Sequence, residues 1–185
     1  MDNRTVLLDR ALELLAARGY DAVGVQEIAA AAEVTKPTLY HYFGSKRGLL
    51  DTLLAERFAP LHTDLCTAAA YQGDLPLNLY QVAGVYFDFA RENGQFYGLL
   101  MTVRHAPPHS EAYQAALHLE RRQIAVLESL FTQALPHMEG RHHRYALTFL
   151  GMINVYITLA VGGDIALDHE VQHQAVHQFM YGVFS

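Results

Sequence analysis

The chain has 185 residues, enough to bury the core of one large domain or of two small ones. Its composition, 51% hydrophobic and 17% charged, excludes global disorder. The single cysteine, Cys66, excludes an internal disulfide framework and fits a reducing compartment. Residues 1–50 contain six basic and six acidic residues, so the whole net charge of −6 arises after residue 50. This asymmetry predicts two functional parts, residues 1–50 and residues 51–185.

The first part of the chain is predicted to form short helices with clear ends. Apolar residues at helical spacing between Leu7 and Leu15 make one face, and Gly19 ends that helix. A short helix is expected at 25–31. Thr35 can cap the next helix, which should end at Gly44. After Gly44, Ser45 can cap a long helix that runs to about residue 70.

The second part also follows a helical period. The segment "YQGDLP" (71–76) is a break, and apolar faces then predict helices at about 79–90, 95–104 and 117–134. An uncharged segment at 145–163 and a last segment at 167–184 complete the pattern. The expected fold is therefore all-α, with about nine helices.

One segment, "TKPTLYHYFGSKRGLL" (35–50), contains no acidic residue. A short helix, a tight turn and a second short helix form a helix-turn-helix, whose second helix can enter the major groove of DNA. Leu39 and Phe43 are four residues apart and should point inward, which leaves the polar side chains on other faces. Lys46 opens the following helix, where free N–H groups favour a phosphate.

Residues 7–58 resemble the N-terminal DNA-binding domain of the TetR family of transcriptional regulators. The resemblance rests on Gly19-Tyr20, on "EIA" in the second helix, on "VTKPTLYHYF" in the third and on "SK" with "LL" at the start of the fourth. It implies a dimer that reads a palindromic operator, with these DNA-binding residues: Thr35, Lys36, Thr38, Tyr40, His41, Tyr42 and Lys46. Among them, Tyr42 and Lys46 would hold phosphates. Gly24 departs from the pattern, because the family usually has Ser or Thr there and one side-chain phosphate contact would be lost.

For the rest of the chain the resemblance is one of architecture only. It implies a small effector among the middle helices and dimerisation through the last two, at about 145–163 and 167–184. An apolar site with a few polar groups predicts a mostly apolar effector and these contacts: Tyr86, Phe89, Tyr97, Met101, Glu120, Arg121, Phe149, Asn154 and Tyr156. The alternative is that the aromatic residues are plain core and that the polar groups pair internally.

Two patterns have competing interpretations. His169, His173 and His177, spaced by four residues, could hold a divalent metal, but we interpret them as a polar helix face and predict no metal or cofactor. The uncharged 145–163 segment is near the length that spans a bilayer, but we interpret it as a dimerisation helix and expect no membrane insertion.

The predicted function is that of a cytoplasmic, ligand-responsive transcriptional repressor. An activator, or a repressor that needs its effector, fits the same residues. An enzyme is not expected, because the chain has no nucleophile motif, phosphate loop or HExxH sequence. A helical binding module that has lost DNA binding is a third possibility, which only Gly24 supports.

Overall fold

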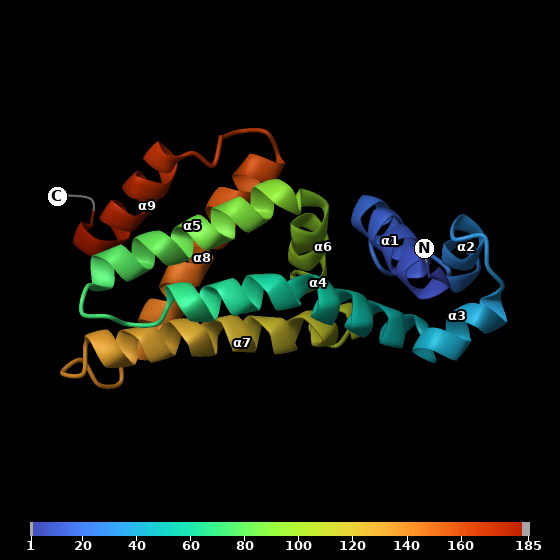
Figure 1. The fold of residues 1–185 in the computed structure, drawn as a ribbon, viewed down its shortest axis with the longest axis horizontal. Coiled ribbons are helices and arrows are strands. Elements are labelled where there is room, and N and C mark those ends of the chain that lie inside the picture. Colours follow the sequence, from blue (N-terminus) through green and yellow to red (C-terminus); the bar gives the residue numbers. More distant parts are fainter. Residues whose placement is uncertain (1, 183–185) are drawn as a thin grey trace. The chain divides into compact units, whose positions relative to one another are not determined.

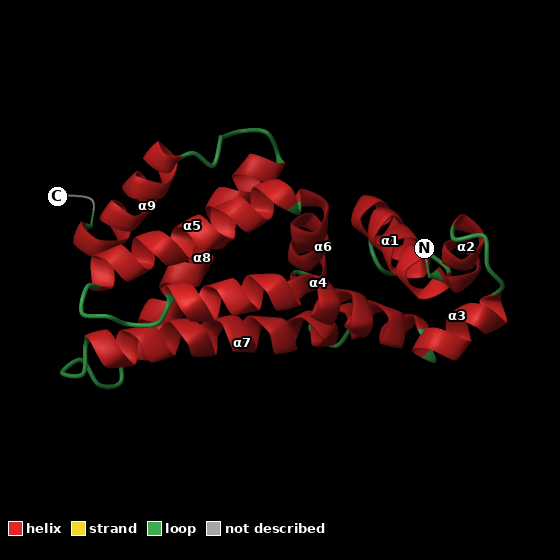
Figure 2. Cartoon of the chain, viewed as in Figure 1, coloured by secondary structure: helices red, strands yellow, loops and turns green. Residues whose placement is uncertain are grey.

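The computed structural model describes residues 2–182, and within this range every regular element is a helix (Figure 2). The all-α prediction is confirmed. The nine helices are α1 (Asn3–Arg18), α2 (Val25–Ala31), α3 (Lys36–Phe43), α4 (Lys46–Ala68), α5 (Leu75–Glu92), α6 (Gly94–Arg104), α7 (Glu111–Ala134), α8 (His142–Val161) and α9 (His169–Tyr181) (Figure 1). The predicted end of the last helix, near residue 184, lies outside the described residues.

The helices pack into two compact units. One contains the chain up to Phe58 together with Gln95–Leu119, and the other contains Ala59–Gly94 together with the chain from Glu120 onward. Helices α4 and α7 therefore each begin in the first unit and end in the second. This division by packing does not test the predicted boundary between two functional parts at residue 50, which stays a prediction.

In the first unit, α1 packs against both α2 and α3. The apolar face of α1 is fully buried at Leu7, Ala11 and Leu15, as its spacing predicts. Two ion pairs, Arg4 with Glu56 and Arg57 with Asp9, join α1 to the part of α4 in the same unit. These contacts give α3 a fixed support.

In the second unit, α5 packs against α8 and α9. The close approach of α9 depends on Gly84, because a Cβ atom at this position would lie 2.9 Å from the side-chain nitrogen of Gln172. The same nitrogen donates a hydrogen bond to the backbone oxygen of Tyr80, at 2.8 Å. Gly84 and Gln172 therefore help to hold α5 against α9, although these helices are far apart in sequence.

The C-terminal end of α4 is closed by a buried side chain from α5. The amide nitrogen of Asn78 donates to the backbone oxygens of Ala68 (2.8 Å) and Ala70 (3.1 Å). Carbonyl groups at a helix end have no partner within the helix, so this side chain supplies donors that the helix lacks. Eight residues before that end, Pro60 lies inside α4, two residues after Phe58, where the first unit's N-terminal segment ends.

Candidate nucleic-acid interface

Helix α3 presents a polar, aromatic face to solvent. Lys36 and His41 are exposed, and Tyr40 and Tyr42 are 40% and 38% exposed. The ammonium group of Lys36 lies 5.6 Å from the centre of the Tyr40 ring, an attractive cation–π distance. The face therefore combines hydrogen-bond donors and a positive charge with flat apolar surfaces.

The opposite face and both ends of α3 hold the helix in place. Leu39 is fully buried and Phe43 is 9% exposed, so the inward pair predicted from their spacing is confirmed. The Thr35 side chain accepts a hydrogen bond from the Thr38 backbone nitrogen at 3.3 Å, which is the predicted N-cap. At the other end Gly44 adopts φ 71°, a left-handed conformation that suits glycine.

Before α3, the connection from α2 contains a residue with unusual backbone geometry. Glu33 has φ 56°, the one positive φ of a residue other than glycine among residues 2–182. Such a conformation costs free energy and persists only where the surrounding structure imposes it. The tight turn between α2 and α3 is thus set by the packing of the two helices rather than by a glycine.

Lys46 makes two contacts inside the protein. Its ammonium group donates to the backbone oxygen of Tyr20 and lies 4.1 Å from the centre of the Tyr20 ring. An ammonium group has three hydrogens, so two remain for an anion. Ser45 caps the same helix, accepting from the Gly48 backbone nitrogen at 2.9 Å. The charge at the start of α4 is therefore held in position by contacts within the protein.

The ring of Tyr20 is 6% exposed, and its hydroxyl donates to a Glu111 carboxylate oxygen at 2.6 Å. Burial, together with the hydrogen bond to Glu111, raises the pKa of Tyr20 above its ordinary value. Sequence reasoning missed this pair, because 91 residues separate its members. The motif Gly19-Tyr20 marked the position but not the partner.

Helix α2 begins at Gly24 without a side-chain cap. The backbone oxygen of Gly24 accepts from the Glu27 and Ile28 nitrogens at 3.1 and 3.2 Å. No hydroxyl is available here to contact a phosphate, as the sequence indicates.

Comparisons with known proteins identify this arrangement. Residues 7–53 match the family model of bacterial regulatory proteins of the tetR family, and this range contains α2, α3 and the start of α4. Residues 7–53 are therefore the DNA-binding domain of a TetR-family transcriptional regulator. A curated relative, the HTH-type transcriptional activator FasR of Mycolicibacterium smegmatis, is 27% identical over 187 residues, covering 100% of this chain and 84% of FasR. The relatives are DNA-binding regulators rather than enzymes, in agreement with the prediction.

Two solved structures share the fold. FadR from Bacillus subtilis, solved in complex with stearoyl-CoA, has a TM-score of 0.83 at 19% identity and covers 97% of this chain and 98% of its own. AibR, solved in complex with isovaleryl coenzyme A and operator DNA, has a TM-score of 0.73 at 20% identity and covers 99% of this chain and 100% of its own. At identities of 19% and 20%, these similarities show a shared fold alone.

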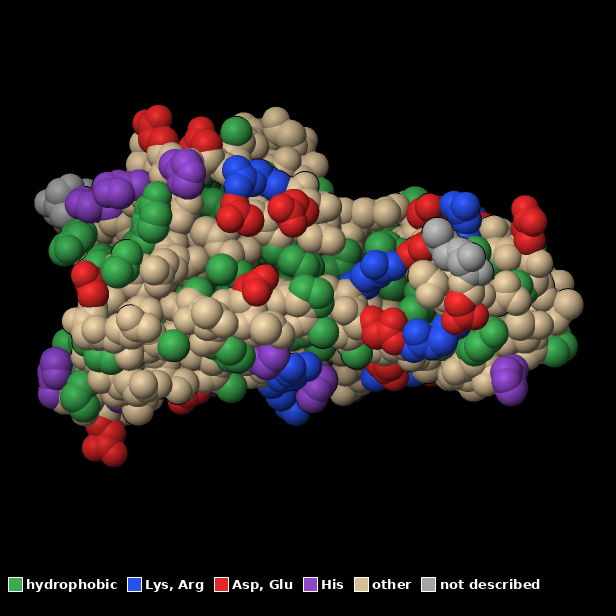
Figure 3. All heavy atoms as spheres, in the orientation of Figure 1, with side chains coloured by type: hydrophobic (Ala, Val, Ile, Leu, Met, Phe, Trp, Pro, Cys, Tyr) green, Lys and Arg blue, Asp and Glu red, His purple; other side chains and the backbone are tan. Residues whose placement is uncertain are grey.

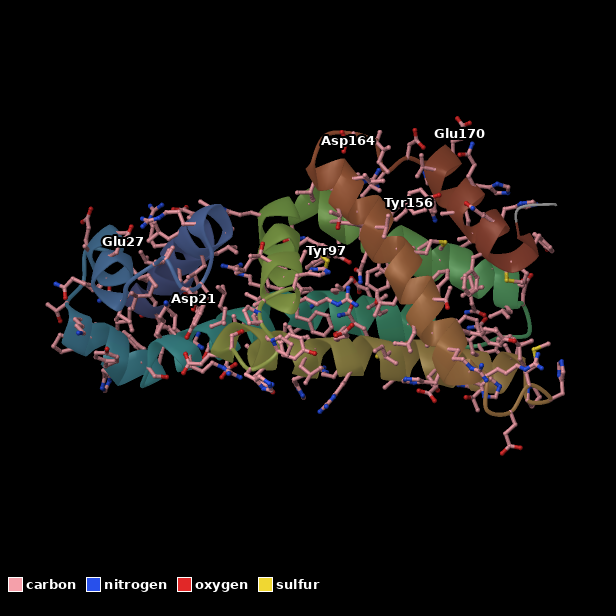
Figure 4. The ribbon with its side chains drawn as sticks, turned by 180° about the vertical axis from the view of Figure 1, so that it is seen from behind. Asp21, Glu27, Tyr97, Tyr156, Asp164 and Glu170 are labelled. Atoms are coloured by element: carbon pink, nitrogen blue, oxygen red, sulfur yellow. The ribbon has the colours of Figure 1, made fainter. Side chains whose placement is uncertain are left out.

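The predicted effector residues are not gathered in one place. Tyr86, Phe149 and Asn154 are buried in the second unit, and the Tyr86 hydroxyl donates to the side-chain oxygen of Gln123 at 3.0 Å. Arg121 is exposed. The remaining candidates divide between the two units. Tyr97 and Met101 lie on α6 in the first unit. The second unit contains Phe89 on α5, Glu120 on α7 and Tyr156 on α8, and Figure 4 labels Tyr97 and Tyr156. Burial raises the pKa of Tyr97 above its ordinary value.

The second unit contains a large groove with a volume of about 1020 Å³. Its walls are mainly apolar and come from α5, α7, α8, α9 and the loop after α7. Of the nine predicted effector residues, Tyr156 lines it. The full lining is Leu75, Phe131, Leu135, Met138, Tyr145, Thr148, Gly151, Met152, Val155, Tyr156, Leu159, Gln178, Phe179 and Met180. Sequence reasoning anticipated aromatic and methionine walls but selected mostly other residues.

The outer face of α8 is apolar and exposed. Leu147, Val155, Leu159 and Val161 are 43%, 59%, 39% and 53% exposed, although they are large hydrophobic residues, and Val155 and Leu159 also line the groove. Several exposed large apolar residues on one helix are typical of an interaction site. By length and composition alone, α8 is also apolar enough to cross a membrane.

The histidines of α9 form an exposed row, seen as purple side chains over this helix in Figure 3. The rings of His173 and His177 stack with centres 6.0 Å apart, and the Tyr80 hydroxyl lies 3.4 Å from the Nδ1 atom of His169. Among the described residues, no group of three or more His, Cys, Asp or Glu side chains could hold a metal ion. The interpretation of the row as a polar helix face stays a prediction.

Proposed function

We propose that this TetR-family regulator is a dimeric repressor that leaves a palindromic operator when a mostly apolar effector binds. The face of α3 carries the proposal, because a supported helix with outward Lys36, Tyr40 and His41 suits the major groove. Thr35, Thr38 and Tyr42 would add contacts at its edges, and Lys46 would hold a phosphate at the start of α4. DNA as the partner makes the cytoplasm the proposed location.

We propose that a second copy of the chain covers the outer face of α8, with α9 beside it. The exposed, uncharged residues of α8 favour this partner, since their burial in a two-fold dimer would remove apolar surface from water. Leu147→Asp should raise the dimer dissociation constant at least about tenfold, because it places a charge in that interface and Leu147 does not line the groove. Leu77→Asp is a matched control, since Leu77 is 52% exposed but lies on α5.

We propose an acyl-CoA as the effector class. One support is the apolar groove that Phe131 and Tyr156 line. The other is that two proteins with the same fold were solved with an acyl-CoA bound, FadR with stearoyl-CoA and AibR with isovaleryl coenzyme A. The effector must bind the conformation that cannot bind DNA more tightly than the one that can, because otherwise it would not change the populations of the two. The nine residues chosen from the sequence remain candidates for this contact.

The test is a fluorescence-anisotropy titration against DNA from upstream of the protein's own gene, at two salt concentrations. Tight, salt-sensitive binding that resists competitor DNA, followed by release on adding stearoyl-CoA, supports the proposal. Weak binding that competitor DNA abolishes contradicts self-regulation, and DNA binding that stearoyl-CoA does not affect contradicts the effector class. FasR is an activator, so the direction of control needs a reporter fused to the same DNA. Higher expression in a deletion strain supports repression.

A further inference from the structure

Tyr20 joins three segments of the first unit. It lies in the connection between α1 and α2, its backbone oxygen and ring hold Lys46 of α4, and its hydroxyl holds Glu111 of α7. All three residues belong to the same compact unit. Because the Tyr20 side chain is 6% exposed, water competes little for these contacts.

Glu111 is the first residue of α7, a helix that continues into the second unit. Twelve residues later on the same helix, Gln123 accepts the hydrogen bond from the buried Tyr86. Both residues therefore belong to one continuous helix. Further along still, Phe131 lines the large groove. A shift of α7 caused by events in the second unit would therefore move the carboxylate that holds Tyr20.

We propose that the Tyr20–Glu111 hydrogen bond is a regulatory coupling contact, through which α7 controls the α1–α2 connection and the DNA-facing Lys46. With the bond in place, a displacement of α7 changes the support of Lys46 and of the neighbouring helix α3. Without it, the first unit keeps its fold but no longer follows α7. The regulatory meaning of this contact rests on the proposed function, but its existence can be tested without DNA or effector.

The first experiment is a double-mutant cycle read by amide hydrogen exchange. Tyr86→Phe removes the hydrogen bond to Gln123 and so perturbs α7 from the second unit. Peptides covering residues 36–50 report on α3 and the start of α4. In the wild-type background Tyr86→Phe should change their exchange rates at least about threefold, and in the Tyr20→Phe background it should leave them nearly unchanged.

Three variants make the result specific. Tyr20→Phe keeps the ring beneath Lys46 and the backbone oxygen, so it removes the hydroxyl alone. Glu111→Gln should weaken the response, since its amide oxygen can still accept the bond but lacks the negative charge that strengthens it. Glu128→Gln should preserve the response, because Glu128 is a carboxylate of α7 that contacts His143 instead. Unfolding curves measured on each variant show that the fold is intact.

The proposal is overturned if Tyr86→Phe has the same effect on exchange in the wild-type and Tyr20→Phe backgrounds, including no effect in either. A separate measurement uses stearoyl-CoA as the probe. If it releases DNA from the wild type, then Tyr20→Phe should retain DNA while still binding stearoyl-CoA, and release from that variant as from the wild type also overturns the proposal. If stearoyl-CoA releases no DNA from the wild type, the proposed effector class fails, and the exchange cycle alone decides the coupling.

Discussion

Lys46→Gln removes one positive charge at the start of α4 while keeping most of the side-chain length. In the structure the Lys46 ammonium uses one hydrogen for the Tyr20 oxygen, which leaves two for a phosphate. Each phosphate that a protein neutralises steepens the plot of log affinity against log salt concentration by about 0.9. A dimer contributes two such contacts, so the variant's slope should be less steep by about 1.8.

The size of this effect suits a direct assay. Between 50 and 200 mM salt, a slope difference of about 1.8 means that the wild type loses about tenfold more affinity than Lys46→Gln. Fluorescence anisotropy with one labelled duplex at four or more salt concentrations measures both slopes. Arg10→Gln is the control, because Arg10 is about half exposed and pairs with Glu13 at 2.7 Å. An unchanged slope for Lys46→Gln would refute the phosphate contact and leave Lys46 as an internal support for Tyr20.

Three further predictions concern stability. Asn78→Ala should lower the free energy of unfolding by about 1.5 kcal/mol, since its hydrogen bonds to the backbone oxygens of Ala68 and Ala70 are lost and some helix propensity is gained. Asn93→Ala, which loses one local hydrogen bond, should cost less in urea unfolding. Gly84→Val should cost about 1–3 kcal/mol by displacing Gln172, and an unchanged melting temperature would contradict this packing. Burial, and secondarily Arg122, lowers the pKa of His62, so the folded state disfavours the charged imidazole. Stability should therefore fall as pH drops below about 6.5, and less so in His62→Gln; parallel pH profiles would disprove this.

The elements that the sequence predicts best are those with local causes. The caps, turn glycines and inward residues of α3 all lie within ten residues of one another, so spacing and capping rules suffice to find them. The nine helices follow from the same local signals. Their observed starts differ from the predicted ones where polar residues extend a helix beyond its apolar face, as in the first turn of α1.

The contacts that sequence reasoning missed join residues that are distant along the chain. Tyr20 meets Glu111, Tyr86 meets Gln123 and Asn78 reaches back to α4, and no periodic pattern specifies such pairs. The groove was missed for a related reason. Its lining depends on which faces of α7, α8 and α9 meet, and the apolar residues of a helix do not by themselves indicate whether they border a cavity or the core.

Pro60 interrupts the backbone hydrogen bonding of α4. Proline has no N–H group, so α4 lacks the backbone hydrogen bond that would otherwise join residue 60 to residue 56, and the ring crowds the preceding turn. This turn lies where α4 passes from the first unit to the second. A bend at such a point starts from a helix that already lacks one backbone hydrogen bond. We therefore expect α4 to bend most easily where it passes from the first unit to the second, and Pro60→Ala should make it stiffer.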